Sequence, residues 1–278
     1  MDTKQVNIAV QVSGLIRYWD ATYPLLEYWN SLFENVKFTF FISTWNNLDV
    51  WYDKDKHNAD IIDNPNLDDF NFVAKWAKHD SNEVKLVIQG KNSPSCWFSY
   101  MFKKVTELRN KYEKENNITF DGVIQTRNDI FISKELLEYV SSVVRSNKYY
   151  YNRDTIFCSG NLHLLGKGDK RNLLLGDDNF CFGHPKCIDD CSTLYDDIII
   201  KEEYDNSNLH FIRGEHLIKL KKQVISIHNP FFLFREKEVA TKREISPTKM
   251  LNLISTRGVE WVFNESPTDL VDNFLAYN

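Results

Sequence analysis

The alternation of aliphatic and polar residues near the start of the chain predicts a buried strand. Between Val6 and Ser13 every second residue is aliphatic, and the run ends at Gly14. Apolar residues then recur at helical spacing over residues 22–33, with Pro24 expected in the first helical turn. A second strand is expected over residues 37–45. Strand, helix and strand in this order form a βαβ unit.

Strand-like and helix-like segments continue to alternate beyond this unit. We expect a polar loop region over residues 48–83, a short strand over 84–89, and a long helix whose apolar stripe runs from Trp97 to Tyr112. A strand through Val123 to Asp129 and a helix capped by Ser133 follow. Strands separated by helices predict an α/β sheet whose ligand crevice lies at the carboxyl ends of the strands.

The second half of the sequence is less regular. Strands are expected within residues 149–159, 162–165, 180–183 and 223–228, and helices beginning at Pro185, Arg213 and Ser266. Glu215 would then stand at the start of its helix.

Composition indicates an ordinary folded protein. Of its 278 residues 42% are hydrophobic and 26% are charged. The net charge of −5 argues against a broad nucleic-acid surface but leaves room for a small basic pocket. No apolar run approaches the roughly 20 residues needed to cross a bilayer, and the first residues lack the pattern of a signal peptide. We therefore expect a cytoplasmic protein without a transmembrane segment.

Three of the five cysteines and one histidine have a spacing compatible with zinc. Cys181, His184, Cys187 and Cys191 form the pattern C-x2-H-x2-C-x3-C. The competing interpretation is structural, because Cys181 lies in a strand-like run and the other two cysteines are four residues apart on an expected helix. Small buried thiols are usual at such positions.

Arg127 and Asp129 are the most informative charged pair in the sequence. On an extended segment they share a face with Val123 and Gln125. A guanidinium suits phosphate oxygens, and a carboxylate suits a divalent cation, so the pair is a candidate anchor for a nucleoside diphosphate. The alternative is a structural ion pair at a strand end.

Five short motifs occur in order between about residues 6 and 235. They are Ser13-Gly14-Leu15-Ile16-Arg17, Thr44-Trp45, Val123-Ile124-Gln125-Thr126-Arg127-Asn128-Asp129, Asp178-Asn179-Phe180-Cys181-Phe182-Gly183 and Gly214-Glu215-His216-Leu217-Ile218. With these motifs the sequence resembles the GT-A-like glycosyltransferases of bacterial lipopolysaccharide synthesis and of large DNA viruses. The resemblance implies a single domain over residues 1–278 with a GT-A-like (Rossmann-like) mixed sheet flanked by helices. Its nucleotide-sugar-binding half would extend to about residue 132, and the acceptor-binding half would cover residues 133–278.

The resemblance also implies the reaction. A hexosyl- or pentosyltransferase of polysaccharide biosynthesis would move a sugar from a UDP- or GDP-sugar to a glycan or glycoprotein acceptor. The residues implied in nucleotide-sugar binding are Val12, Ser13, Gly14, Arg17, Thr44, Trp45, Arg127 and Asp129. Gly14 would permit a tight turn, and Arg17 would reach the base or a phosphate.

Metal and base assignments follow from the same resemblance. Asp129 would replace the last carboxylate of the Asp-x-Asp motif that binds Mn²⁺ or Mg²⁺, with His228 as the candidate second ligand. Arg127 stands where that motif has its first aspartate, so either fewer protein ligands hold the metal or the arginine neutralises the diphosphate. Asp178 and Glu215 are the two candidates for the catalytic base; Asp178 ranks first, and Glu215 is then the candidate contact to the donor sugar.

Two other classes of function remain open. A metal-dependent phosphohydrolase would use Asp129, Asp177 and Asp178 around a cation. A non-catalytic glycan-binding module would account for the 14% aromatic content. The product separates the three classes: a transferase releases nucleoside diphosphate, a hydrolase releases phosphate, and a binding module releases neither.

Overall fold

The computed structural model describes ten stretches of the chain. They are residues 5–14, 18–45, 78–82, 94–127, 129–146, 151–159, 179–201, 209–227, 231–234 and 244–265. The strands expected over 84–89 and 162–165 and the helix start at Ser266 lie outside them.

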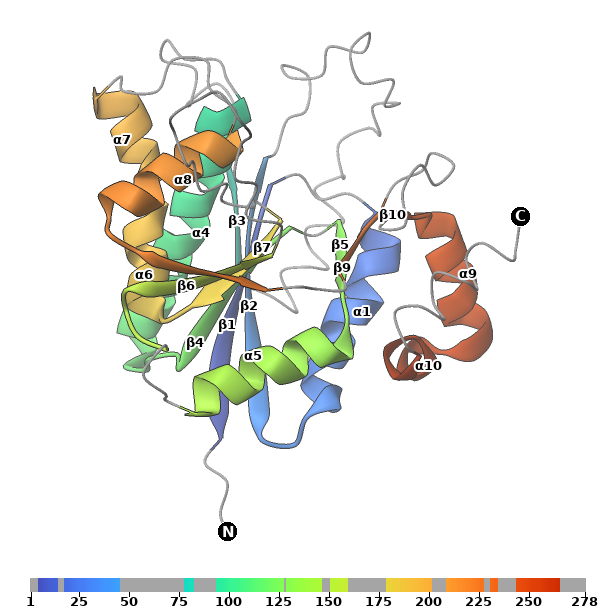
Figure 1. Cartoon of the computed structure of the whole chain (residues 1–278). Coiled ribbons are helices and arrows are strands. Elements are labelled where there is room, and N and C mark those ends of the chain that lie inside the picture. Colours follow the sequence, from blue (N-terminus) through green and yellow to red (C-terminus); the bar gives the residue numbers. More distant parts are fainter. Residues whose placement is uncertain are drawn as a thin grey trace, which may run out of the picture.

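The described residues form a mixed α/β sheet, as the sequence predicts. Its strands are β1 (Val6–Ser13), β2 (Val36–Trp45), β3 (Lys78–Asn82), β4 (Gly122–Thr126), β6 (Thr155–Ser159), β7 (Phe180–Gly183) and β8 (Gln223–Ile227). Their spatial order is β3-β2-β1-β4-β7-β6-β8 (Figure 1). The first four are parallel, β7 is antiparallel to both of its neighbours, and β8 is parallel to β6.

Helices cover both faces of this sheet. They are α1 (Trp19–Leu32), α4 (Pro94–Asn116), α5 (Lys134–Ser146), α6 (Pro185–Ser192), α7 (Leu194–Lys201), α8 (Leu209–Lys219), α9 (Pro247–Arg257) and α10 (Val259–Asn264). One layer contains α4, α6, α7 and α8, while α1 and α5 lie on the opposite face, and α9 and α10 pack against α1 (Figure 1). A smaller sheet joins β5 (Ile130–Ile132), β9 (Phe231–Phe234) and β10 (Glu244–Ile245). Among the described residues, no helix is long and apolar enough to cross a membrane.

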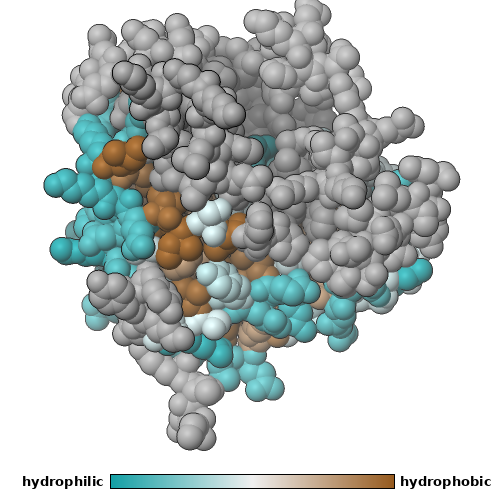
Figure 2. Space-filling view, viewed as in Figure 1, coloured by the Kyte–Doolittle hydropathy of each residue, from teal (hydrophilic) through white to brown (hydrophobic). Residues whose placement is uncertain are grey.

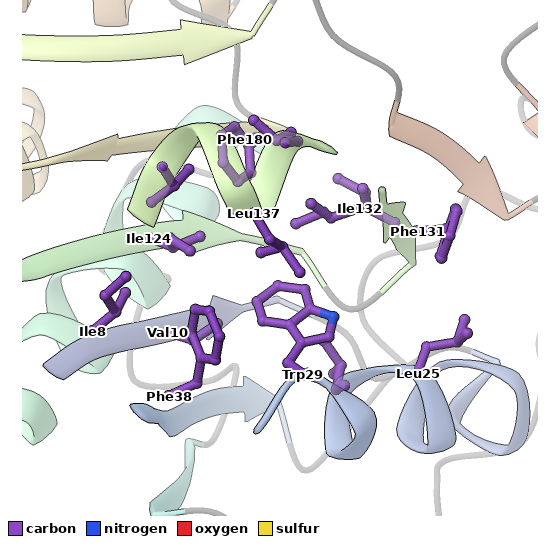
Figure 3. Packing of buried hydrophobic residues seen from close by; sticks show 14 of the residues in the cluster. Ile8, Val10, Leu25, Trp29, Phe38, Ile124, Phe131, Ile132, Leu137 and Phe180 are labelled. Carbon is purple, nitrogen blue, oxygen red and sulfur yellow. The ribbon is translucent and has the colours of Figure 1, made fainter. Parts of the chain in front are cut away.

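Apolar cores form on both faces of the sheet because the central strands are buried on both sides. The aliphatic residues at even positions of β1 point toward α1 and α5, whereas Ala9 points toward α4. Trp29 of α1 lies in the middle of the first core, with its ring 5.4 Å from that of Phe38, and Leu137 lies beside it (Figure 3). Farther out, Tyr28 stacks on Phe263 of α10 at 5.6 Å.

The outer face of the sheet beside α8 is partly apolar. Figure 2 shows hydrophobic atoms gathered in the region where Figure 1 draws α8 and β8. Ile218 of α8 is 53% exposed, and Val224 and Ile225 of the edge strand β8 are half-buried. A partly exposed edge strand has this mixed character because, within the described stretches, only one of its sides is paired.

Three local predictions are wrong. The expected strand through Asp129 ends at Thr126, because the chain leaves the main sheet after β4 and joins the smaller sheet through β5. The region expected to be loop contains β3, a polar strand paired with β2. Finally, α1 begins at Trp19, so Pro24 lies beyond its first turn. The proline has no amide hydrogen to donate to the Asp20 carbonyl.

Several other described elements agree with the sequence patterns. Strands β1, β2, β7 and β8 lie within one residue of the expected bounds, α6 begins at Pro185 as expected, and α4 contains the whole predicted apolar stripe. Ser133 caps α5 as predicted, because its hydroxyl accepts a hydrogen bond from the Leu136 amide at 3.4 Å.

Candidate active site

The order of the strands singles out the carboxyl ends of β1 and β4. After β1 the chain passes through α1 to β2 on one side, whereas α4 leads into β4 on the other side. The two helices cover opposite faces of the sheet. Ligands of open α/β sheets bind at such a reversal of strand order, outside the carboxyl ends. Ser13 and Thr126 are the last residues of these two strands.

Gly14 turns the chain directly above this point. Its φ of 111° lies in the region that favours glycine, and its amide donates to the Ser43 carbonyl at 3.1 Å. A Cβ placed on Gly14 would meet no atom of the described residues within 4 Å, so these residues leave space beside the end of β1. Arg17, the third motif residue expected here, lies outside the described residues.

A buried polar layer lies beneath the same edge, on the face covered by α4. The Gln125 side-chain amide donates to the Ser13 hydroxyl at 2.8 Å. Gln11 stands opposite Gln125 in register and accepts from the Thr106 hydroxyl of α4 at 3.4 Å. Gln11 Nε2 and Gln125 Oε1 have no hydrogen-bond partner among the described residues. Unpaired polar atoms in a core are costly, which marks this layer as functional or hydrated.

The remaining residues of the first two motifs lie close to this edge. Val12 is buried in the core toward α1, so its backbone rather than its side chain is near the carboxyl end. Thr44 is fully buried, and its hydroxyl has no partner among the described residues. The backbone of Trp45 ends β2, while its side chain lies outside the description.

Arg127 and Asp129 bind one another at the end of β4. The Arg127 guanidinium donates from Nε to one carboxylate oxygen at 2.8 Å and from Nη2 to the other at 2.6 Å. Its Nη1 donates to the Asn179 side chain at 3.4 Å, and the Thr126 hydroxyl donates to the Asn179 carbonyl at 3.3 Å. The Asp129 side chain is 2% exposed and that of Arg127 is 26% exposed. The arginine is therefore the member of the pair that reaches the surface.

The described residues do not fit a divalent cation held by the protein. Both oxygens of Asp129 already accept hydrogen bonds from Arg127. No group of three or more acidic, histidine or cysteine side chains within the described stretches is arranged to hold a metal. His228, the predicted second ligand, lies outside these stretches.

The structural interpretation of the cysteine-rich segment agrees with the geometry. Cys181, Cys187 and Cys191 are buried and lie outside any disulfide. A hydrogen bond with Cys187 that favours the neutral thiol, together with burial, raises the pKa of Cys191 well above its ordinary value. His184 begins α6, where its Nδ1 accepts from the Lys186 amide at 3.2 Å. These residues stabilise α6 and do not form a zinc site.

The two candidate catalytic carboxylates are placed differently. Asp178 lies outside the described residues, but its neighbour Asn179 contacts Arg127. Glu215 was expected at a helix start, and this is wrong: α8 begins at Leu209, so Glu215 lies in its middle. The helix starts earlier because Ile212 already packs in the core. Glu215 therefore does not face the free amides of a helix start, which would lower the basicity of a carboxylate.

Arg213, a neighbour of Glu215, was missed as a candidate. It is 4% exposed, its guanidinium lies 5.4 Å from the Phe98 ring centre, and its Nη2 approaches the Cys181 sulfur at 3.5 Å. Cys181 stands opposite Gln125 in register. Gln125 was also missed as a site residue, although an isolated glutamine in an apolar strand was a visible signal.

A second buried polar cluster joins α7 to α8. His216 Nδ1 lies 3.1 Å from Asp197 Oδ2, and its Nε2 lies 3.3 Å from the Thr193 hydroxyl. Lys219 donates to the same Asp197 oxygen at 2.8 Å. Burial lowers the pKa of His216, so the neutral ring is favoured in the fold.

Comparison with known proteins finds similar solved structures, among them two glycosyltransferases. No family model and no curated protein matches this chain. The apo-form glycosyltransferase GlyE of Streptococcus pneumoniae TIGR4 is 13% identical, with a TM-score of 0.38, and the match covers 82% of this chain and 46% of GlyE. This chain thus spans less than half the length of GlyE. A glycosyltransferase involved in the glycosylation of the major capsid of PBCV-1 is 7% identical, with a TM-score of 0.44, over 90% of this chain and 98% of that one.

Proposed function

We propose that the chain is a glycosyltransferase that binds a nucleotide-sugar donor where β1 and β4 end. The observation that carries this proposal is the meeting of Ser13, Gly14 and Arg127 at the reversal of strand order. Such an edge offers a turn without a side chain and a permanent positive charge. A nucleoside diphosphate requires these two properties, since its phosphates need close backbone approach and charge compensation.

Arg127 is proposed to neutralise the diphosphate. Its guanidinium is held by Asp129 and Asn179, so it is oriented before the ligand binds. Charge that develops on the departing diphosphate is stabilised best by groups that need no reorganisation. Arg17, Thr44 and the backbone of Val12 and Gly14 are proposed to contact the base and ribose, with Trp45 beside them.

Transfer requires removal of a proton from the acceptor hydroxyl as it attacks the anomeric carbon. Asp178 is proposed as this base, because it immediately precedes Asn179 in the sequence and Asn179 contacts Arg127. Glu215, in the middle of α8, is proposed to contact the donor sugar. Asp178→Asn should then lower turnover roughly 10² to 10⁴-fold at nearly unchanged donor affinity, whereas Glu215→Gln should weaken donor binding as well. If Glu215→Gln lowers turnover alone and Asp178→Asn weakens donor binding, then Glu215 is the base and Asp178 contacts the donor sugar.

A divalent cation stays a separate prediction. Mn²⁺ or Mg²⁺ held by Asp129 and His228 would require Asp129 to release a bond to Arg127. Donor binding measured after EDTA treatment, with and without added Mn²⁺, tests this point. Arginine neutralisation predicts similar affinities in both conditions, and a strict Mn²⁺ requirement would favour the metal.

The proposal is tested by a thermal-shift panel of UDP-, GDP- and dTDP-sugars followed by product analysis. A donor at 100 times its Kd should add about 2.7 kcal/mol of stability. Arg127→Met should abolish most of this shift, while Arg153→Met, which removes the same charge from a 74% exposed side chain, should not. Released phosphate would indicate a phosphohydrolase, and binding of glycans without turnover would indicate a binding module. Absence of any nucleotide-sugar effect would refute the proposal.

A further inference from the structure

The orientation of the Gln125 amide group is fixed by two neighbours. Its Nε2 lies 2.8 Å from the Ser13 hydroxyl oxygen and 3.5 Å from the Thr126 carbonyl oxygen. A carbonyl only accepts hydrogen bonds, so the NH₂ end of the amide must be the end that faces both. Gln125 therefore donates to Ser13, and the Ser13 hydroxyl acts as the acceptor.

This arrangement leaves the Ser13 proton available. A hydroxyl carries one proton and two lone pairs, and one lone pair is occupied by Gln125. No described residue accepts a hydrogen bond from the Ser13 hydroxyl, although Ser13 is 3% exposed. The next residue is Gly14, beside which the described part of the chain leaves open space. A ligand in that space would meet a hydroxyl that is ready to donate.

We propose that Gln125 is a positioning residue, which turns the Ser13 hydroxyl into a donor to an acceptor oxygen of the bound nucleotide. The inference rests on the proposed nucleotide site and specifies the polarity of one contact in it. The acceptor oxygen belongs either to the diphosphate or to a carbonyl group of the base. Gln125 contributes without touching the ligand, since it lies one strand away and is 1% exposed.

Gln11 provides a matched control for this role. It stands opposite Gln125 in register, is equally buried, and faces the same helix. Its described hydrogen bond leads to Thr106 of α4 rather than to Ser13. Replacing either glutamine by methionine removes a buried amide of similar size, so general loosening of the core should affect both variants alike. Only the Gln125 variant removes the donor to Ser13.

The experiment measures UDP and GDP dissociation constants by calorimetry for the wild type and four variants: Ser13→Ala, Gln125→Met, Ser13→Ala/Gln125→Met and Gln11→Met. Loss of one neutral hydrogen bond should weaken binding roughly 3- to 10-fold in Ser13→Ala and in Gln125→Met. The double variant should bind as weakly as Ser13→Ala alone, since Gln125 acts only through Ser13. Gln11→Met should bind as the wild type does.

Each outcome decides the inference. Gln125 would have only a structural role if the double variant weakened nucleotide binding by the product of the two single effects. The same would follow if Gln125→Met and Gln11→Met weakened binding equally. Unchanged binding by Ser13→Ala would overturn the proposal even if Gln125→Met failed to fold. Wild-type protein that binds neither UDP nor GDP would overturn the proposed function as well, so the two failures are distinguishable.

The same measurements identify the acceptor oxygen. If it belongs to the diphosphate, Ser13→Ala should weaken UDP, GDP and inorganic pyrophosphate by the same factor. If it belongs to the base, the loss should appear for the preferred nucleotide and be absent for pyrophosphate.

Discussion

Replacing Arg127 by methionine should destabilise the fold through the carboxylate that the arginine holds. Asp129 is 2% exposed and loses two charge-assisted hydrogen bonds, of 2.8 and 2.6 Å, in this variant. Removing one partner of a fully buried pair costs about 3 to 5 kcal/mol, and an exposed pair contributes at most about 1 kcal/mol. With the arginine 26% exposed, we expect a loss of about 2 to 3 kcal/mol.

The double variant Arg127→Met/Asp129→Asn should lose less stability than the sum of its two single variants. Asp129→Asn removes the charge and should by itself lower the free energy of unfolding by about 1 to 2 kcal/mol. The NH₂ group of the asparagine would face one guanidinium N–H of Arg127, and two donors cannot form a hydrogen bond. In Arg127→Met/Asp129→Asn no charge remains buried, so the combined loss should be smaller than the sum by about 1 to 2 kcal/mol.

Urea denaturation followed by tryptophan fluorescence at pH 7 gives these free energies, provided the m-value is unchanged. The exposed pair Lys104 and Glu107 is the matched control, with an expected coupling near zero. Losses at Arg127 and Asp129 that add within about 0.5 kcal/mol would refute the reasoning, since the two side chains would then act independently.

Three further predictions concern the rest of the fold. Because burial lowers the pKa of His216 from its ordinary 6.5, the unfolded chain binds a proton more readily, and stability should fall as the pH drops below about 6.5. His216→Gln should reduce the difference in the free energy of unfolding between pH 7 and pH 5, and an unchanged pH dependence would contradict this prediction. Gly122→Ala should cost about 1 to 3 kcal/mol in urea, because its Cβ would approach Val144 to 2.8 Å and the Tyr151 hydroxyl to 2.9 Å, whereas a loss under 0.5 kcal/mol would mean that these neighbours move freely. Phe182→Ala should cost about 3 to 5 kcal/mol, since its ring stacks on Phe157 at 4.4 Å, and a melting temperature equal to that of the wild type would exclude this.

The elements that the sequence predicts correctly are those with local patterns. Strand β1, strand β2 and the long helix α4 each carry an apolar period over eight or more residues. The end of β4 could not be predicted, since apolar residues continue after Asp129 and the break depends on pairing with β9, about 100 residues away. Likewise β3 has no apolar period and is defined by its partner β2.

The candidate site shows the same division between local and distant causes. The Arg127 and Asp129 pair was predictable because its members are only two positions apart in the sequence. The bond from Gln125 to Ser13 depends on the register of two strands more than 100 residues apart in the sequence, which no local pattern contains. The start of α8 was misplaced because residues 205–208 resemble a loop and the apolar stripe before Arg213 is short.

The packing of α10 on α1 also bears on how the protein is made. Tyr28 stacks on Phe263, yet roughly 200 residues separate the end of α1 from the start of α9. At about 5 to 20 residues per second, a ribosome needs roughly 10 to 40 s to synthesise that interval. During this time the outer side of α1 remains open on the nascent chain, where chaperones that bind apolar surfaces have access to it. The packing around α1 is therefore completed late in biosynthesis, although β1 and β2 on either side of α1 in the sequence are the first strands to be translated.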